Sequence, residues 1–295
     1  MKPSFTLCLR RRITEYTRTQ VMGILNVTPD SFYAGSHAFA EDEAAARAER
    51  LVAEGADMVD VGGYSSRPGA AEVPVEEELR RVEIGIRAVR RASATVPVSV
   101  DTFRAEVARR AVADWGADII NDISGGSLDP EMHATVAELR VPYILMHMRG
   151  TPQTMQQLTS YTDIVADVAA ELSRPLERLR RLGVADVIVD PGFGLFSKTL
   201  EQNYELMARL PELMALIEAP MLVGISRKSM ITRLCGVGAE DALPGTTALN
   251  TAAMLAGAAI IRVHDVAEAV QARDVVAEML HYSARRPSFF NFQIA

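Results

Sequence analysis

Short apolar runs rich in valine and isoleucine alternate with longer segments of helical period from about residue 20 to residue 282. Such runs are typical of strands that are buried on both faces of a parallel sheet. The expected strands are at 21–25, 58–61, 96–100, 118–120, 142–147, 187–190, 220–225 and 258–263. The expected helices follow them at 41–54, 75–91, 105–115, 130–139, 163–182, 201–210, 246–256 and 266–280. Eight such units favour an α/β fold, a single (β/α)8 TIM barrel, over an open doubly wound sheet.

The ends of three expected helices support this alternation. A glycine, the residue that commonly ends a helix in the left-handed conformation, stands just before a strand at Gly55, Gly116 and Gly257. The barrel is expected to fill the chain as one domain, 1–295, with an N-terminal extension at 1–19 and a C-terminal tail at 283–295. We expect the phenylalanines of this tail to dock on the barrel or on a partner subunit.

Composition narrows the class of protein. The hydrophobic content of 48% is ample for a large core, and no apolar run approaches the roughly 20 residues that cross a bilayer. Arg10, Arg11 and Arg12 follow an apolar run instead of preceding it, which is the reverse of a secretory signal, so we expect a cytoplasmic protein. A net charge of −7 argues against nucleic acid or an anionic membrane as partner. Cys8 and Cys235 match no disulfide framework and no metal-binding spacing.

Polar residues stand at or after the end of every expected strand, at Asn26, Asp60, Asp101, Asn121, His147, Asp190, 226–229, and Arg262 with His264. Barrels of this kind place their chemistry where strands end and loops begin. Each residue alone has a structural explanation, since a strand-terminal Asp is often a helix cap and His147 could be a core histidine with satisfied nitrogens. Their coincidence at all eight strands favours a functional site.

These residues divide into two chemical groups. Asp101, Asp190 and Asn121 suit a planar heterocycle with adjacent N–H groups, to which a carboxylate presents two parallel acceptors. The second group suits a phosphate and consists of Arg67, Arg262 and His264 with Asn26 and Ser66. A Mg²⁺ ion held partly by diphosphate oxygens needs only one or two protein oxygens, and Asn26 offers one.

Eight motifs resemble, in order and spacing, those of the dihydropteroate synthase family, and they span nearly the whole chain. They are Gly-Ile-Leu-Asn-Val-Thr-Pro-Asp-Ser-Phe at 23–32, Asp-Val-Gly-Gly-Tyr-Ser-Ser-Arg-Pro-Gly-Ala at 60–70, Ser-Val-Asp-Thr at 99–102, Ile-Asn-Asp-Ile at 120–123, Met-His-Met-Arg-Gly-Thr-Pro at 146–152, Asp-Pro-Gly-Phe-Gly at 190–194, Gly-Ile-Ser-Arg-Lys-Ser at 224–229 and Arg-Val-His-Asp-Val at 262–266.

The resemblance implies a barrel fold and a transferase of folate biosynthesis. The family joins p-aminobenzoate to 6-hydroxymethyl-7,8-dihydropterin diphosphate, and forms 7,8-dihydropteroate and diphosphate. It also implies Mg²⁺ as cofactor, small molecules as the substrates, a homodimer, and inhibition by sulfonamide mimics of aminobenzoate.

The resemblance further implies roles for individual residues. The pterin would be held by Asp101, Asn121, Asp190 and Lys228. The diphosphate and Mg²⁺ would be held by Asn26, Arg67, Arg262 and His264. Ser66, Arg67 and Ser229 would lie near the aminobenzoate. Apart from the resemblance, we expect Arg227 to brace its loop. Lys228, Arg67, Asp101 and Asn26 are the residues expected to take part in catalysis.

The sequence departs from the family pattern in three loops. Tyr64 and Ser66 replace a usual Glu and Thr after the second strand, and 33–36 lacks a usual acidic residue after the first. The loop after the sixth strand is one residue longer and contains Phe196. This residue would either bulge outward or narrow the aminobenzoate pocket and disfavour sulfonamides.

Two other functions fit part of the pattern. A methyltetrahydrofolate–corrinoid methyltransferase shares the acidic strand ends, but the cations at 226–229 and 262–264 favour a diphosphate substrate. A non-catalytic pterin-binding paralogue would explain the altered loops, although every matched pterin and anion residue is present.

Overall fold

The strands expected from the sequence form a closed barrel in a computed structural model that describes residues 3–28, 37–64 and 72–283. The strands run parallel in the order β8-β7-β6-β5-β4-β3-β10-β9. A further parallel bridge between Val189 and Met221 joins the two outer strands and closes the barrel. The barrel strands are β3 (Gln20–Asn26), β4 (Met58–Gly62), β5 (Val98–Asp101), β6 (Ile119–Asp122), β7 (Tyr143–Met146), β8 (Val187–Asp190), β9 (Leu222–Val223) and β10 (Ile260–Val263). The TIM-barrel prediction is confirmed.

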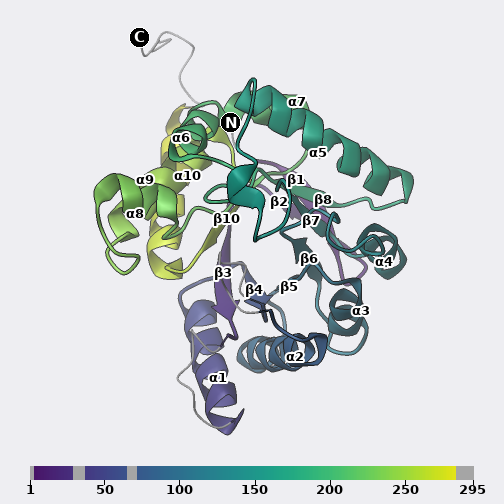
Figure 1. The fold of residues 1–295 in the computed structure, drawn as a ribbon. Coiled ribbons are helices and arrows are strands. Elements are labelled where there is room, and N and C mark those ends of the chain that lie inside the picture. The colour runs from purple at the N-terminus through teal and green to yellow at the C-terminus, as the bar shows by residue number, and fades with distance from the viewer. Residues whose placement is uncertain (1–2, 29–36, 65–71, 284–295) are drawn as a thin grey trace.

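Helices surround the strands on the outside (Figure 1). The eight expected helices are present as α1 (His37–Ala53), α2 (Val75–Ala92), α3 (Ala105–Ala113), α4 (Met132–Leu139), α5 (Ile164–Arg181), α6 (Leu200–Ala208), α9 (Leu243–Ala256) and α10 (Val266–Ser283). Apolar side chains of strands and helices form one continuous core between the two layers. Among the described residues no helix has the length and hydropathy to span a bilayer.

Three short helical segments were not predicted from the sequence: a 3-10 turn at Met155–Gln157, α7 (Leu210–Ile217) and α8 (Ser229–Cys235). Proline explains two of the differences. Pro211 and Pro244 both lie in the first turn of a helix, where the missing N–H costs nothing. Pro211 therefore starts an additional helix, α7, and Pro244 lets α9 start three residues before the expected residue 246. The two-residue β9 is shorter than the expected strand 220–225.

An N-terminal hairpin, also not predicted, closes one end of the barrel. β1 (Phe5–Leu9) pairs with β2 (Arg12–Tyr16) in antiparallel register. The hairpin's apolar side chains pack on a layer of residues contributed by seven barrel strands: Met22, Met58, Ile119, Ile144, Ile188, Leu222 and Ile260. These residues lie near the strand starts, so the hairpin covers the end of the barrel opposite to the predicted site.

The hairpin turn has an unusual conformation for its residues. Arg10 and Arg11 have φ values of 49° and 63°, a region in which Asn and Gly are the usual residues of a two-residue turn. Arg10 is held there by Asp118, whose Oδ1 accepts from Arg10 Nε at 2.7 Å. The backbone N–H of Cys8 donates to Asp186 Oδ2 at 2.7 Å and fixes the hairpin to the barrel.

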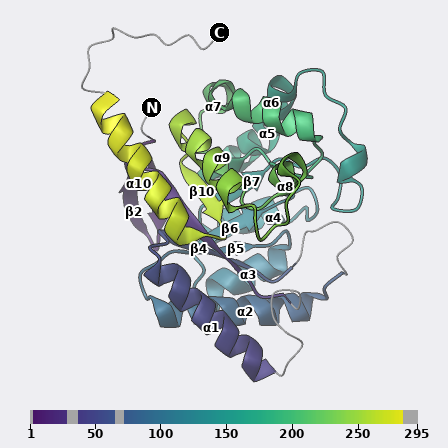
Figure 2. The same cartoon turned by 90° about the vertical axis from the view of Figure 1, so that its left-hand side faces the viewer.

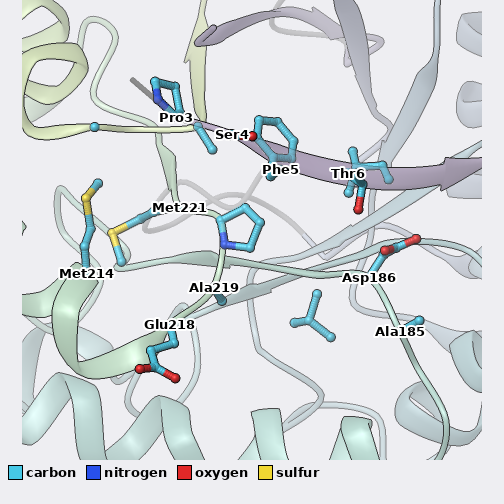
Figure 3. A pocket seen from close by; sticks show the side chains of 15 residues that line it. Pro3, Ser4, Phe5, Thr6, Ala185, Asp186, Met214, Glu218, Ala219 and Met221 are labelled. Carbon is cyan, nitrogen blue, oxygen red and sulfur yellow. The ribbon is translucent and has the colours of Figure 1, made fainter. Parts of the chain in front are cut away.

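A cavity of about 510 Å³ lies beside the hairpin. Figure 3 shows Phe5 and Thr6 on one side of it, and Glu218, Ala219 and Asp186 on the other. It is separate from the predicted site, because it opens at the end of the barrel where the strands begin.

Figure 2 shows α10 on the outside of the barrel, where it packs beside α9. The tail expected to dock, 283–295, lies outside the described residues beyond Ser283.

Candidate active site

The C-terminal strand ends bring together four polar side chains in one network. Arg262 on β10 lies at its centre and donates from Nε to Asp60 Oδ2 at 2.6 Å. Its Nη2 donates to Asp101 Oδ2 at 3.0 Å. Asn121 on β6 donates from Nδ2 to the same Asp60 oxygen at 3.0 Å. The network therefore spans the barrel from β10 through β4 and β5 to β6.

One buried acceptor of the network has no donor in the described part of the chain. Asp60 is fully buried, and its Oδ1 has no hydrogen-bond partner among the described residues. Burial raises the pKa of Asp101, the charge of Arg262 opposes this shift, and the nearby Asp60 adds to it. A ligand that brings N–H groups would therefore stabilise this cluster, since buried acceptors without donors are costly.

Asp190 and Lys228 form a second polar group next to this network. Asp190 Oδ1 accepts from the backbone N–H of Gly192 at 2.8 Å, and burial raises the pKa of Asp190. Lys228 Nζ donates to the carbonyl of Phe193 at 2.8 Å. Burial lowers the pKa of Lys228 to about 8, although the charge of Asp190 opposes this shift. Lys228 thus remains largely an ammonium at neutral pH.

A cavity of about 260 Å³ connects these groups, and its lining includes Asn26, Phe196, Lys228, Ser229, Arg262 and His264. Ser229 enters it from the first residue of α8, with Lys228 as the helix N-cap. The structure thus brings eight predicted site residues to the cavity or to the two polar groups beside it: Asn26, Asp101, Asn121, Asp190, Lys228, Ser229, Arg262 and His264.

His264 and Arg227 are fixed by neighbouring side chains. Ser226 Oγ lies 3.0 Å from His264 Nδ1 and also accepts from the backbone N–H of His264. Arg227 forms an ion pair with Asp265, with Nε to Oδ2 at 3.0 Å. Arg227 therefore braces the loop, as expected from the sequence.

Two predicted site residues, Ser66 and Arg67, lie outside the described part of the chain, as does the altered loop 33–36. Tyr64, which replaces a usual Glu, is described. Its ring lies 5.0 Å from that of Phe103, edge to face, and Arg104 stacks over it at 5.4 Å. Tyr64 is therefore packed against the loop before α3.

The additional Phe196 lies at the cavity. It is one of the lining residues, and its ring centre is 5.0 Å from Lys228 Nζ. Of the two alternatives considered from the sequence, this position agrees with a Phe196 that narrows the pocket and not with one that bulges outward. Its effect on sulfonamides stays a prediction.

Sequence reasoning missed two sets of residues. Asp60 received no role, although a carboxylate within the apolar run 58–61 was a signal, because burying such a group requires a partner. His147 is buried and bonded through both nitrogens, to Lys198 Nζ at 3.0 Å and Glu171 Oε2 at 2.9 Å. The expectation of a satisfied core histidine is therefore confirmed, but the sequence did not indicate its partners.

Comparisons with known proteins agree with this geometry. The family model described as "Pterin binding enzyme" matches residues 22–264. Dihydropteroate synthase of Escherichia coli strain K12 is 45% identical over 268 residues, which cover 90% of this chain and 93% of that protein.

Two solved structures are similar over almost the whole barrel. Dihydropteroate synthase of Xanthomonas albilineans with 4-aminobenzoic acid has a TM-score of 0.85 at 41% identity, with 97% of this chain and 100% of that chain covered. The Yersinia pestis enzyme in a sulfonamide drug complex has a TM-score of 0.86 at 40% identity, with 94% and 100% covered. The chain belongs to the dihydropteroate synthase family of pterin-binding enzymes.

Proposed function

We infer that the protein is a dihydropteroate synthase, a transferase that joins p-aminobenzoate to 6-hydroxymethyl-7,8-dihydropterin diphosphate and releases diphosphate. The observation that carries this function is the convergence of Asp101, Asn121 and Asp190 with Lys228 and Arg262 at one end of the barrel. These groups supply acceptors for a pterin ring and cations for a diphosphate around one cavity.

We propose that the pterin binds innermost, against Asp101, Asn121 and Asp190. Arg262 occupies one oxygen of Asp101 in the structure. The N–H groups of the amino-pyrimidine edge would replace that contact, since paired N–H donors match a carboxylate. Arg262 would then be free to turn its guanidinium toward the diphosphate, together with His264 and Arg67.

The donor set fits a Mg²⁺ ion held mainly by the substrate. No group of three or more His, Cys, Asp or Glu in the described part of the chain is arranged to bind a metal. The side chain of Asn26 lines the cavity with Arg262 and His264, so its amide oxygen is available beside the diphosphate site. When bound there, Mg²⁺ would neutralise charge on the leaving diphosphate.

These residues act by positioning and electrostatics. The C–O bond from the pterin methylene to diphosphate breaks, and the amine nitrogen of aminobenzoate bonds to that carbon and loses a proton. Electron release from the dihydropterin ring supports the developing cation, so no activated nucleophile is needed. Arg262 and His264 stabilise the leaving diphosphate, while Lys228 and Ser229 lie on the side where the amine approaches.

Lys228→Ala tests this function. We expect diphosphate release and dihydropteroate formation with Mg²⁺ to fall at least ~10²-fold, as when a preorganised electrostatic contact is removed. Arg233→Ala, which removes an exposed cation on the same helix, is the matched control and should keep wild-type activity.

Near-wild-type turnover of Lys228→Ala would exclude this placement of the site. Pterin binding by calorimetry with no turnover by the wild type would instead support the non-catalytic alternative.

We also propose a homodimer that buries one face of α10. Val275, Met279 and Tyr282 follow the i, i+4, i+7 spacing of one helix face, and each is more than half exposed, at 62%, 53% and 60%. An exposed apolar face of this kind commonly marks a protein interface. The cytoplasmic location expected from the sequence stays a prediction.

A further inference from the structure

The chain uses lysine almost nowhere except at this site. Only three of its 31 cationic side chains are lysines, at positions 2, 198 and 228, and all others are arginines. Lys198 is buried and lies in the loop after β8. Arginine offers a planar fork of donors, whereas lysine offers a compact ammonium with three. The exception at Lys198 therefore suggests that this position needs the compact group.

The ammonium of Lys198 uses all three of its hydrogens. Nζ donates to His147 Nδ1 at 3.0 Å, to the carbonyl of Gly192 at 3.0 Å and to the carbonyl of Phe196 at 3.1 Å. The two carbonyls belong to opposite ends of the same loop. A single ammonium thus ties the ends of loop 192–196 together and fixes them to the end of β7.

The tied loop carries two groups of the active site. The Phe193 carbonyl accepts from Lys228 Nζ, and the Phe196 ring lines the cavity next to it. The loop also packs tightly, because Gly192 has φ 71° and a Cβ there would clash with the His147 carbonyl. A small movement of this loop would therefore shift both Lys228 and Phe196.

A chain of side chains anchors Lys198 from the outside. His147 Nδ1 accepts from Lys198, so in the neutral ring Nε2 carries the proton and donates to Glu171 Oε2 at 2.9 Å. Burial and the charge of Lys198 lower the pKa of His147 to about 4, which keeps the ring neutral. Arg149 Nε holds the carboxylate of Glu171 in turn, at 3.0 Å.

We propose that Lys198 is a positioning residue for aminobenzoate: it fixes loop 192–196, and through it the Phe196 ring and the Phe193 carbonyl that orients Lys228. This inference rests on the proposed condensation with p-aminobenzoate.

The charge of this clamp depends on pH near neutrality. Burial lowers the pKa of Lys198 to about 7; Asp190 and Glu171 oppose the shift, whereas Lys228 and Arg149 add to it. The ammonium is present below this pH and is lost as the pH rises through it. A neutral amine has only two hydrogens, so one of the three bonds is lost.

Lys198→Met tests the proposal, because it keeps a long unbranched side chain and removes the ammonium. We expect KM for aminobenzoate to rise roughly 10- to 100-fold, the loss typical of a hydrogen-bonded charged group. KM for the pterin diphosphate should change less than about threefold, which corresponds to at most one weak neutral hydrogen bond. Thr199→Ala is the matched control: it removes the helix cap on the next residue and leaves the Lys198 bonds in place, so it should lower stability without separating the two KM values.

A second measurement does not depend on turnover. In the full chain labelled with ¹³C-lysine, three lysine signals are expected, and the Lys198 signal is the one missing from Lys198→Met. We expect it to titrate near pH 7, far below the usual lysine pKa of about 10.4. The wild-type KM for aminobenzoate should rise through the same pH, whereas Lys198→Met should keep only the change near pH 8 that belongs to Lys228.

The outcomes separate the positioning role of Lys198 from the proposed condensation. Equal changes in both KM values would overturn the positioning role while leaving the condensation intact. A Lys198 signal that titrates at the usual lysine pKa would overturn the pH dependence of the clamp. A wild type that releases no diphosphate from the two substrates would reject the condensation itself.

Discussion

At the scale of single residues, Asp60 determines how the active site is held together. Its one bonded oxygen accepts from both Arg262 and Asn121, and the side chain has no exposure to solvent. Removing the Asp60 charge leaves Arg262 with one buried carboxylate partner, Asp101, in place of two, which is more costly than losing an exposed pair. Asp60 therefore stabilises the fold and sets the position of Arg262.

We expect Asp60→Asn to lower the free energy of unfolding by about 1.5–3 kcal/mol, because Arg262 keeps its pair with Asp101 but loses the charge-assisted bond to Asp60. Asp114→Asn is the control, since its pair with Arg110 is exposed and should contribute less than about 1 kcal/mol. Urea unfolding of both variants gives the comparison. Similar losses for the two would show that the buried network adds no stability.

Some residues of this site could be identified from the sequence, and others could not. Asp101, Asn121, Asp190 and Lys228 were found because polar groups at strand ends converge in a barrel whatever the details of packing. The partners of Lys198 and His147 could not be found, because residues 147, 171 and 198 meet only through the crossing of β7, α5 and the loop after β8. Sequence spacing carries no record of such contacts.

At the scale of elements, the N-terminal hairpin combines a strained turn with a packing role, since it covers the barrel end. Arg11 is exposed with a φ of 63°, a conformation that costs a non-glycine residue about 1–2 kcal/mol. Arg11→Gly should therefore raise the free energy of unfolding by about 0.5–1 kcal/mol, after the larger chain entropy of glycine is subtracted.

The control for this change is Thr14→Gly, in the extended part of β2, where glycine should lower stability by about 0.5–1 kcal/mol. Thermal and urea unfolding measure both. A loss of stability in Arg11→Gly would mean that the arginine makes a contribution larger than its backbone strain.

An element was predictable where the period of its apolar residues and its length indicated the same type of structure. This held for the eight barrel strands and the eight helices after them. The hairpin was missed because the run 5–9 is followed by charged residues that resemble a solvated terminus. α7 was missed because Pro211 signals a break, although the same residue is well suited to begin a helix.

At the scale of the whole molecule, the proposed dimer predicts a change in oligomeric state. Val275→Lys with Met279→Lys places two charges in the α10 face, which should shift the protein to monomer because burying them is unfavourable. Sedimentation velocity measures the shift. Asp274→Lys is the control, because it changes the charge at an exposed position of the same helix outside the apolar face and should leave the dimer intact.

A wild type that sediments as a monomer at micromolar concentration would contradict the dimer. A dimer that persists in the double variant would place the interface on another face of the barrel.

The hairpin also has a consequence for how the chain acquires its fold. Residues 5–16 leave the ribosome before any barrel strand, but the apolar layer that they cover includes Ile260 of the last barrel strand. A two-stranded hairpin alone is marginally stable in water, so its packing layer is not complete until the last barrel strand has been made. Closure of the barrel end is therefore a late, long-range event in folding, and Phe5, Leu7 and Leu9 remain accessible to chaperones throughout synthesis.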